Sequence, residues 1–234
     1  MDILTNNILF GIVLSLLAFE IGLFVYKKTK LPIFNPLLIA IAIIIAVLVI
    51  FNIDFDSYNN GGQFINMFLG PATVVLAVPL YKQFHLLKEN LVPILIGIFI
   101  GSFVGITSVI ILCFTFGLEN VLTISLLSKS VTTPIGIEIT NQLGGLVPVT
   151  VLAIIVSGIM GAVVGPTLCH LFKIKSELAV GIAIGTASHA VGTTKALELG
   201  ETQGAMSSLS IGIAGIMTVF LAPLCFHLIS LILS

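Results

Sequence analysis

Two short polar segments stand out in a chain that is otherwise almost entirely apolar. Residues 128–138 hold a lysine, several hydroxyl side chains, a proline and a glutamate, and residues 185–195 hold serine, threonines, a histidine and a lysine. Polar and ionisable groups are costly at membrane depth, so by default they mark the path of a solute or an ion. We therefore expect the two segments to face each other and to form a solute site.

The first segment is expected to interrupt a helix and to suit an anion. Pro134 disfavours helical backbone at the residue before it, and Thr132 and Thr133 are β-branched, so a break is expected near 131–134. A half-helix is predicted to begin at Pro134 with Thr133 as its N-cap. Its free N–H groups carry partial positive charge, and Lys129 adds a full charge. The alternative is that Lys129 extends to a membrane interface and the hydroxyls bond to nearby backbone groups. Glu138 lies close enough to neutralise Lys129, which is the main objection to an anion site.

The second segment offers hydroxyls and a group that titrates near neutrality. His189 is the candidate proton carrier if transport is proton-coupled, with Glu138 as a second proton-coupling group. The alternative is that His189 is a hydrogen-bonded packing residue. The predicted substrate-binding residues of both segments are Lys129, Ser130, Thr132, Thr133, Ser188, His189, Thr193 and Thr194.

No enzyme chemistry is expected. Ser128 and Ser188 lack the context of a nucleophile elbow, and the chain has neither a phosphate loop nor a dinucleotide fingerprint. The spacing of His, Cys, Asp and Glu does not suggest a metal site, so we expect no metal and no cofactor.

The composition indicates an integral membrane protein surrounded by a lipid bilayer. Of 234 residues, 58% are hydrophobic and 8% are charged, whereas a soluble domain carries about 25% charged residues. The nine basic residues are all lysines and the net charge is −1, which argues against a nucleic-acid partner. We expect a multi-pass protein of the bacterial plasma membrane.

The polar segments must be held by membrane-spanning helices. Apolar runs long enough to cross a bilayer are predicted at 8–26, 33–51, 64–81, 91–116, 146–172 and 202–233. Two further runs, 119–143 and 177–199, carry the polar segments. If 119–143 enters and leaves the membrane on one face, Lys173 and Lys175 fall on the same side as the other lysine-bearing loops. The predicted fold class is therefore an all-α polytopic membrane protein with about six full spans plus two broken or re-entrant helical segments.

A weak internal similarity suggests an inverted repeat. The tripeptide LVP opens both residues 91–93 and 146–148, and each copy is followed by a pair of glycines four residues apart. We predict one transmembrane domain over 1–234, with N-terminal spans in 1–90, candidate repeat units at 91–145 and 146–201, and a last span in 202–234. The glycine faces also suggest a homodimer.

Several motifs together resemble the LrgB/CidB family. They are KSVTTPI at 129–135, GTASHAVGT at 185–193 and GAMSSL at 204–209, supported by LGPAT at 69–73 and AVPLY at 77–81. The resemblance covers nearly the whole chain. One departure is Ser128, where family members often have proline before the lysine.

The resemblance implies two accounts of function. One is a holin/antiholin-like membrane protein that modulates murein hydrolase activity and cell lysis. The other is a carrier of small carboxylates, since bacterial relatives act in pyruvate uptake and the plastid relative exchanges glycolate and glycerate. Family members commonly work with a small LrgA/CidA-type membrane subunit, which the resemblance implies as a partner.

The residues themselves favour a carrier. A lesion-forming protein has no need for a lysine, a histidine and a proline-broken helix at membrane depth, whereas a selective site does. A hydrophilic pore, the third alternative, would show an amphipathic stripe along a whole span. We therefore predict a carrier of pyruvate, glycolate, glycerate or a similar 2-oxo or 2-hydroxy acid.

Overall fold

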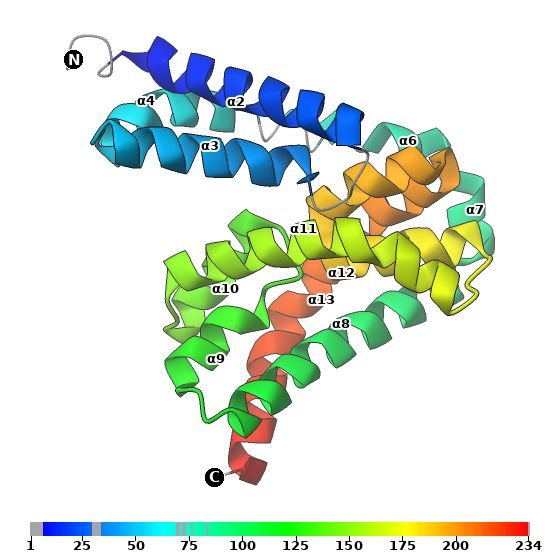
Figure 1. The fold of residues 1–234 in the computed structure, drawn as a ribbon. Coiled ribbons are helices and arrows are strands. Elements are labelled where there is room, and N and C mark those ends of the chain that lie inside the picture. The colour runs from blue at the N-terminus through cyan, green and yellow to red at the C-terminus, as the bar shows by residue number, and fades with distance from the viewer. Residues whose placement is uncertain are drawn as a thin grey trace. The chain divides into compact units, whose positions relative to one another are not determined.

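The protein is described from a computed structural model, which covers residues 7–29, 34–68, 71, 74–75, 77–82 and 84–233. Every regular element in these ranges is a helix (Figure 1). The chain divides into two compact units, Met1–Val75 and Leu76–Ser234. The predicted all-α fold class is confirmed.

Unit 1 contains α2 (Ile8–Thr29), α3 (Pro36–Ile50) and α4 (Phe55–Asn66). Two glycines bring α2 and α4 into backbone contact, because a Cβ added at Gly11 would lie 2.9 Å from the Cα of Gly61. Beside them, Ser15 Oγ and Tyr58 OH share a hydrogen bond of 2.9 Å. Most of α4 falls between the predicted spans at 33–51 and 64–81, and the structure shows that this polar connection is a helix packed on α2.

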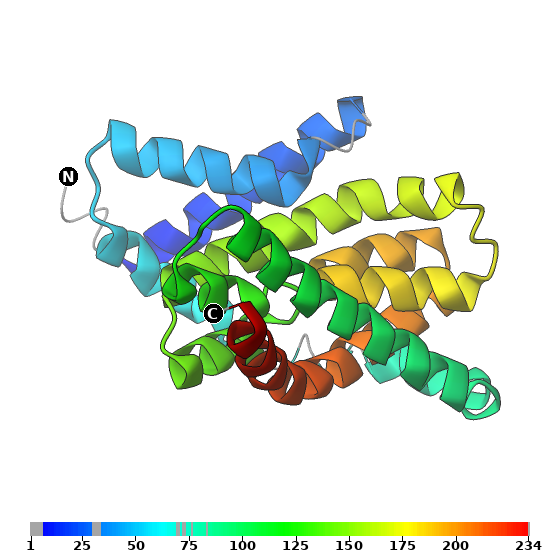
Figure 2. The same cartoon turned by 90° about the horizontal axis from the view of Figure 1, so that it is seen from below.

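Unit 2 contains the polar segments. Its helices are α6 (Ala77–Lys82), α7 (Phe84–Glu89), α8 (Leu91–Thr115), α9 (Asn120–Leu127), α10 (Thr133–Leu143), α11 (Val147–Leu171), α12 (Glu177–Leu199) and α13 (Glu201–Leu233). Helices α8 and α11 run in opposite directions in both views (Figures 1 and 2). The start of α8 and the end of α11 lie at one end of unit 2, and α9 and α10 lie at the other.

Four helices of the described ranges are long and apolar enough to cross a bilayer: α2, α8, α11 and residues 201–228 of α13. Helix α3 is apolar but has 15 residues, or about 22 Å of helix against a hydrocarbon core of about 30 Å. The predicted span at 64–81 is not one described helix. Helix α4 ends at Asn66 and α6 begins at Ala77, and residues 69, 70, 72, 73 and 76 lie outside the described ranges.

Two apolar clusters hold α8 to the rest of unit 2. The first half of α8, with Ile94 and Ile98, packs with Ile182 of α12 and with Met206 of α13. The second half packs with α9, α10 and the later part of α13. The middle of α8 carries Gly97, Gly101 and Gly105 in place of large side chains, which leaves space between the two clusters.

Candidate functional site

The first polar segment is a break between α9 and α10. Helix α9 ends at Leu127, and the N-cap of α10 is Thr132, whose backbone is extended at φ −68° and ψ 151°. The expected N-cap, Thr133, is therefore the first helical residue, and Pro134 is the second. Proline is tolerated there because the N–H groups of a first helical turn need no partner within the helix.

Helices α9 and α10 fold back on each other as a hairpin. Ser128 Oγ donates to the carbonyl of Gly136 at 3.3 Å. After α10, the chain returns to α9, where the N–H of Leu146 donates to Ser125 Oγ at 2.7 Å and Thr150 Oγ1 donates to the carbonyl of Ser125 at 2.8 Å. The chain that follows α10 thus returns to the last turns of α9, and residues 129–132 form the tip of the hairpin.

The second polar segment also forms a hairpin, because α12 is broken at His189. The φ of His189 is 42° and its ψ is −139°, a conformation that non-glycine residues rarely adopt. The two halves fold together so closely that a Cβ added at Gly192 would lie 3.2 Å from the carbonyl oxygen of Ile184. Both halves pack on the same part of α13, since Gly185 and Thr193 each contact Ser207.

The first turn of α10 in the first hairpin and the tip of the second hairpin reach one residue of α11 from opposite ends of unit 2. His189 Nε2 donates to the carbonyl of Ile154 at 2.9 Å. On the other side, a Cβ added at Gly136 would lie 2.5 Å from the Cδ1 of Ile154. The two polar segments therefore both contact Ile154, one from each side.

A cavity of about 560 Å³ lies beside the tips, lined by the middle of α8, the first hairpin's tip and the first half of α12. Lys129 supplies the charged side chain of this lining. Its Nζ donates to Ser130 Oγ at 2.9 Å, and no carboxylate of the described residues pairs with it. The expected neutralising group, Glu138, is exposed and accepts a hydrogen bond from Gln142 at 2.8 Å. The cavity lining therefore holds one lysine amine that no carboxylate of the described ranges pairs with.

Two hydroxyls that the site prediction did not include also line the cavity. Ser102 of α8 is 7% exposed and Thr186 of α12 is 6% exposed, and neither side-chain oxygen has a hydrogen-bond partner in the structure. Leaving such a group unpaired in a protein interior costs about 1–3 kcal/mol. Thr186 lies in the second polar segment and Ser102 in the first candidate repeat unit, 91–145, but only the tertiary structure distinguishes them from other helical hydroxyls.

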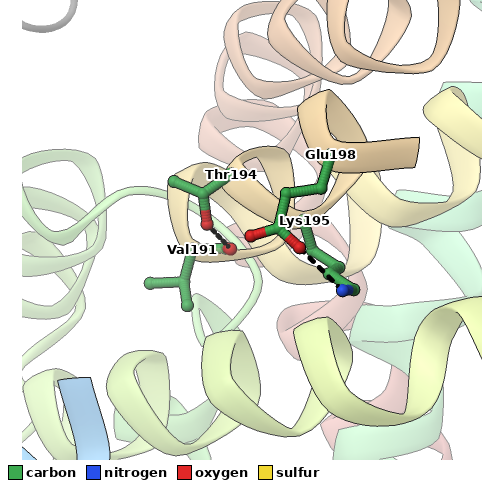
Figure 3. A network of polar contacts seen from close by, with 4 residues as sticks. All are labelled: Val191, Thr194, Lys195 and Glu198. Carbon is green, nitrogen blue, oxygen red and sulfur yellow. Dashed lines mark hydrogen bonds and ion pairs between the residues drawn. The ribbon is translucent and has the colours of Figure 1, made fainter. Parts of the chain in front are cut away.

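Of the predicted substrate-binding residues, Lys129 and Ser130 line the cavity. Thr132 and Thr133 are half-buried at the start of α10 and are not part of the lining. Thr194 is exposed, and its hydroxyl donates to the carbonyl of Val191 at 2.7 Å (Figure 3). The same stretch of α12 carries the pair between Lys195 and Glu198, with 2.7 Å between Nζ and Oε2.

The remaining predicted residues pack inside the protein. Ser188 is buried against Gly161, where an added Cβ would overlap its side chain. His189 is 4% exposed and lies against Gly158, where an added Cβ would be 2.7 Å from its Cε1. Its bond to the backbone of α11 is the arrangement expected of the packing alternative.

Thr193 fixes the second half of α12 to α13. Its hydroxyl donates to the carbonyl of His189 at 2.9 Å and shares a hydrogen bond of 2.7 Å with Ser207 Oγ, and Thr193 and Ser207 are both fully buried.

We expect Thr193→Val to destabilise the protein by about 1–3 kcal/mol, because Ser207 loses its partner. The double variant Thr193→Val/Ser207→Ala should recover part of this loss. Thermal unfolding in detergent would measure both, and additive losses would contradict the prediction.

Comparison with known proteins finds relatives that match nearly the whole chain. The family model of the LrgB-like family matches residues 15–228. The chain is 41% identical over 213 residues to the uncharacterized protein YxaC of Bacillus subtilis (strain 168), a match that covers 91% of this chain and 93% of the relative. It is 38% identical over 221 residues to the antiholin-like protein LrgB of the same organism, covering 94% and 96%. For the antiholin-like protein LrgB of Bacillus cereus (strain B4264), identity is 37% over 216 residues, covering 92% and 94%. No solved structure matches the chain.

Proposed function

Because the chain belongs to the LrgB-like family, we propose that it is a multi-pass protein of the bacterial plasma membrane that carries small monocarboxylates. The observation that supports this proposal is the cavity beside the first hairpin's tip, the middle of α8 and the first half of α12, where no carboxylate of the described residues pairs with Lys129. The proposed substrates are pyruvate, glycolate, glycerate or similar 2-oxo and 2-hydroxy acids. We propose no catalytic step.

The charge of the cavity fits a small anion. A carboxylate that enters the interior of a membrane protein needs a partner to replace its water, and an ammonium group gives it a charge-assisted hydrogen bond. The chain between Lys129 and the start of α10 is short, so the partial positive charge of that helix N-terminus acts in the same region. Lysine is a compact point charge that lacks the bidentate geometry of arginine, and weaker geometric restraint suits a substrate that must be released.

The arrangement of the hairpins fits transport. Broken helices that meet near the middle of the protein from opposite ends are a common plan of secondary transporters, and they place the substrate at the point where they meet. The repeat units at 91–145 and 146–201 remain a prediction. Proton coupling through His189 and Glu138 also remains a prediction, as do the homodimer and the small LrgA/CidA-type subunit.

An antiholin-like role is the second candidate function. The names of two relatives that cover nearly the whole chain support it directly, whereas transport is supported by the cavity. The two functions are compatible, because the movement of metabolic acids would alter metabolism and so affect lysis indirectly. They differ in what the isolated protein does to a membrane.

Uptake by proteoliposomes of the purified protein tests both candidates. Labelled pyruvate, glycolate and glycerate would be supplied with and without a pH gradient, and the release of a large trapped dye would be followed in parallel. We expect saturable uptake of at least one acid while the dye is retained. Protein-free liposomes are the control for passive entry of the protonated acids.

Two results would contradict transport. Dye release without saturable uptake would favour a membrane lesion, as expected of a holin-like protein. The loss of both signals, also after a small LrgA/CidA-type subunit is added, would leave the carrier proposal without support.

A further inference from the structure

We propose that Ser102 and Thr186 form a second polar subsite in the cavity, which recognises the oxygen on the second carbon of a 2-oxo or 2-hydroxy acid. The proposal rests on the carrier function and deepens it. Lys129 would bind the carboxylate, and the two hydroxyls would distinguish substituted acids from plain ones of the same length.

The first observation is the burial of two unpartnered hydroxyls on facing helices. Ser102 lies in the middle of α8 and Thr186 in the first half of α12, each with less than a tenth of its surface exposed. Neither oxygen has a hydrogen-bond partner, and both residues line the cavity that Lys129 lines. Buried polar groups are paired in most proteins, so an unpaired one in a cavity calls for a ligand or a water.

The second observation is that other helical hydroxyls in this chain are satisfied by their own helix. On α8, Thr107 donates to the carbonyl of Phe103 at 2.8 Å and Ser108 donates to that of Gly105 at 2.9 Å. On α13, Ser210 donates to the carbonyl of Met206 at 2.7 Å. This local bond is the ordinary solution for serine and threonine in apolar helices. Ser102 and Thr186 do not adopt it, so each hydroxyl keeps an unused hydrogen bond beside the cavity that its residue lines.

The packing of α8 on α12 brings the residues that carry the two hydroxyls close together. Gly101 precedes Ser102, and a Cβ added there would lie 3.0 Å from the Cγ2 of Thr186. The close approach at Gly101 puts residues 101–102 of one helix beside residue 186 of the other. The lining of the cavity therefore includes Lys129 and, at the contact between α8 and α12, the two residues whose hydroxyls are unpaired.

A pair of hydroxyls suits both kinds of substituted acid. A hydroxyl donates to a 2-oxo group and both accepts from and donates to a 2-hydroxy group. A plain acid offers neither, so its binding would leave Ser102 and Thr186 unpaired. Sites built to bind a substrate oxygen discriminate strongly against the analogue that lacks it. We expect the wild-type protein to bind lactate and pyruvate about tenfold more tightly than propionate, the strength of one added hydrogen bond.

The experiment measures inhibition of labelled pyruvate uptake in proteoliposomes by unlabelled lactate, pyruvate and propionate, three acids that differ only at the second carbon. The variants are Ser102→Cys and Thr186→Val, which nearly keep side-chain volume, and Thr186→Ser, which keeps the hydroxyl. Thr107→Ala is the matched control, because its hydroxyl is satisfied by its own helix on the exposed side of α8. Monodisperse elution in detergent would establish that each variant folds, and Ser102→Ala and Thr186→Ala replace any variant that does not.

We expect the preference for lactate over propionate to fall from about tenfold to near one in Ser102→Cys and Thr186→Val. The inhibition constant for propionate should stay unchanged, and Thr186→Ser and Thr107→Ala should keep the preference. Equal inhibition by the three acids in the wild type, or an equal loss for all three in the variants, would overturn the subsite and leave the carrier standing. A wild-type protein without saturable uptake would overturn both.

Discussion

Lys129→Ala is expected to lower the efficiency of carboxylate uptake, the ratio of maximal uptake rate to KM, by at least two orders of magnitude. The variant removes the charged side chain that lines the cavity and leaves the substrate carboxylate without a cation. Removing one partner of a buried ion pair costs about 3–5 kcal/mol, and each 1.4 kcal/mol is a factor of ten. The initial rate of uptake over a range of substrate concentrations would measure the effect.

The charge and the position of Lys129 can be separated by two further variants. Lys129→Arg keeps the charge and should retain part of the activity, since guanidinium also binds carboxylate but in a different geometry. Lys175→Ala removes a lysine that is exposed in the connection before α12, and uptake should stay as in the wild type. Undiminished uptake by Lys129→Ala would contradict the site assignment.

The break in the first polar segment could be predicted because its cause is local. Pro134 and the β-branched residues before it end one helix and begin another whatever surrounds them. The predicted N-cap, Thr133, therefore differs from the observed N-cap, Thr132, by only one residue. The break in the second segment has no proline. The sequence predicts that 177–199 is broken, but the position of the break depends on α11. The carbonyl of Ile154 accepts a hydrogen bond from His189, and Gly158 and Gly161 leave room for the side chains of His189 and Ser188. Such a break is tertiary, and periodicity cannot locate it.

The residues of the site also divide into those that the sequence alone can identify and those that depend on tertiary packing. Lys129 could be predicted because a charge in an apolar run is conspicuous in any sequence. Ser102 and Thr186 are the same residue types as Ser108 and Thr107, but the hydroxyls of the first pair lack hydrogen-bond partners while those of the second pair donate to their own helix. A serine in an apolar helix bonds to its own backbone by default, so the sequence gives no reason to expect an unpaired one. The missing hydrogen bonds become visible only when the helices are packed.

Gly185→Ala is expected to prevent stable folding of the second hairpin. A Cβ at this position would overlap the carbonyl oxygen of Ser207 and lie 2.7 Å from its Cα. Both are backbone atoms of α13, so no side-chain rotation relieves the overlap and the two helices must separate. Overpacking that side chains can absorb costs about 1–3 kcal/mol. We expect a larger loss here, seen as a low yield of monodisperse protein and a lower midpoint of thermal unfolding.

The matched control is Gly212→Ala on α13, where an added Cβ would meet no atom within 4 Å. Alanine is favoured over glycine in a helix by about 1 kcal/mol, so this variant should be at least as stable as the wild type. Equal stability of the two variants would show that α12 and α13 can separate without loss. The close packing of Gly185 would then not hold Thr186 at the cavity. A loss of stability in Gly185→Ala alone would mean that the close contact between Gly185 and Ser207 holds α12 against α13. That contact would then also position Thr186, because a shift of α12 away from α13 moves Thr186 together with Gly185.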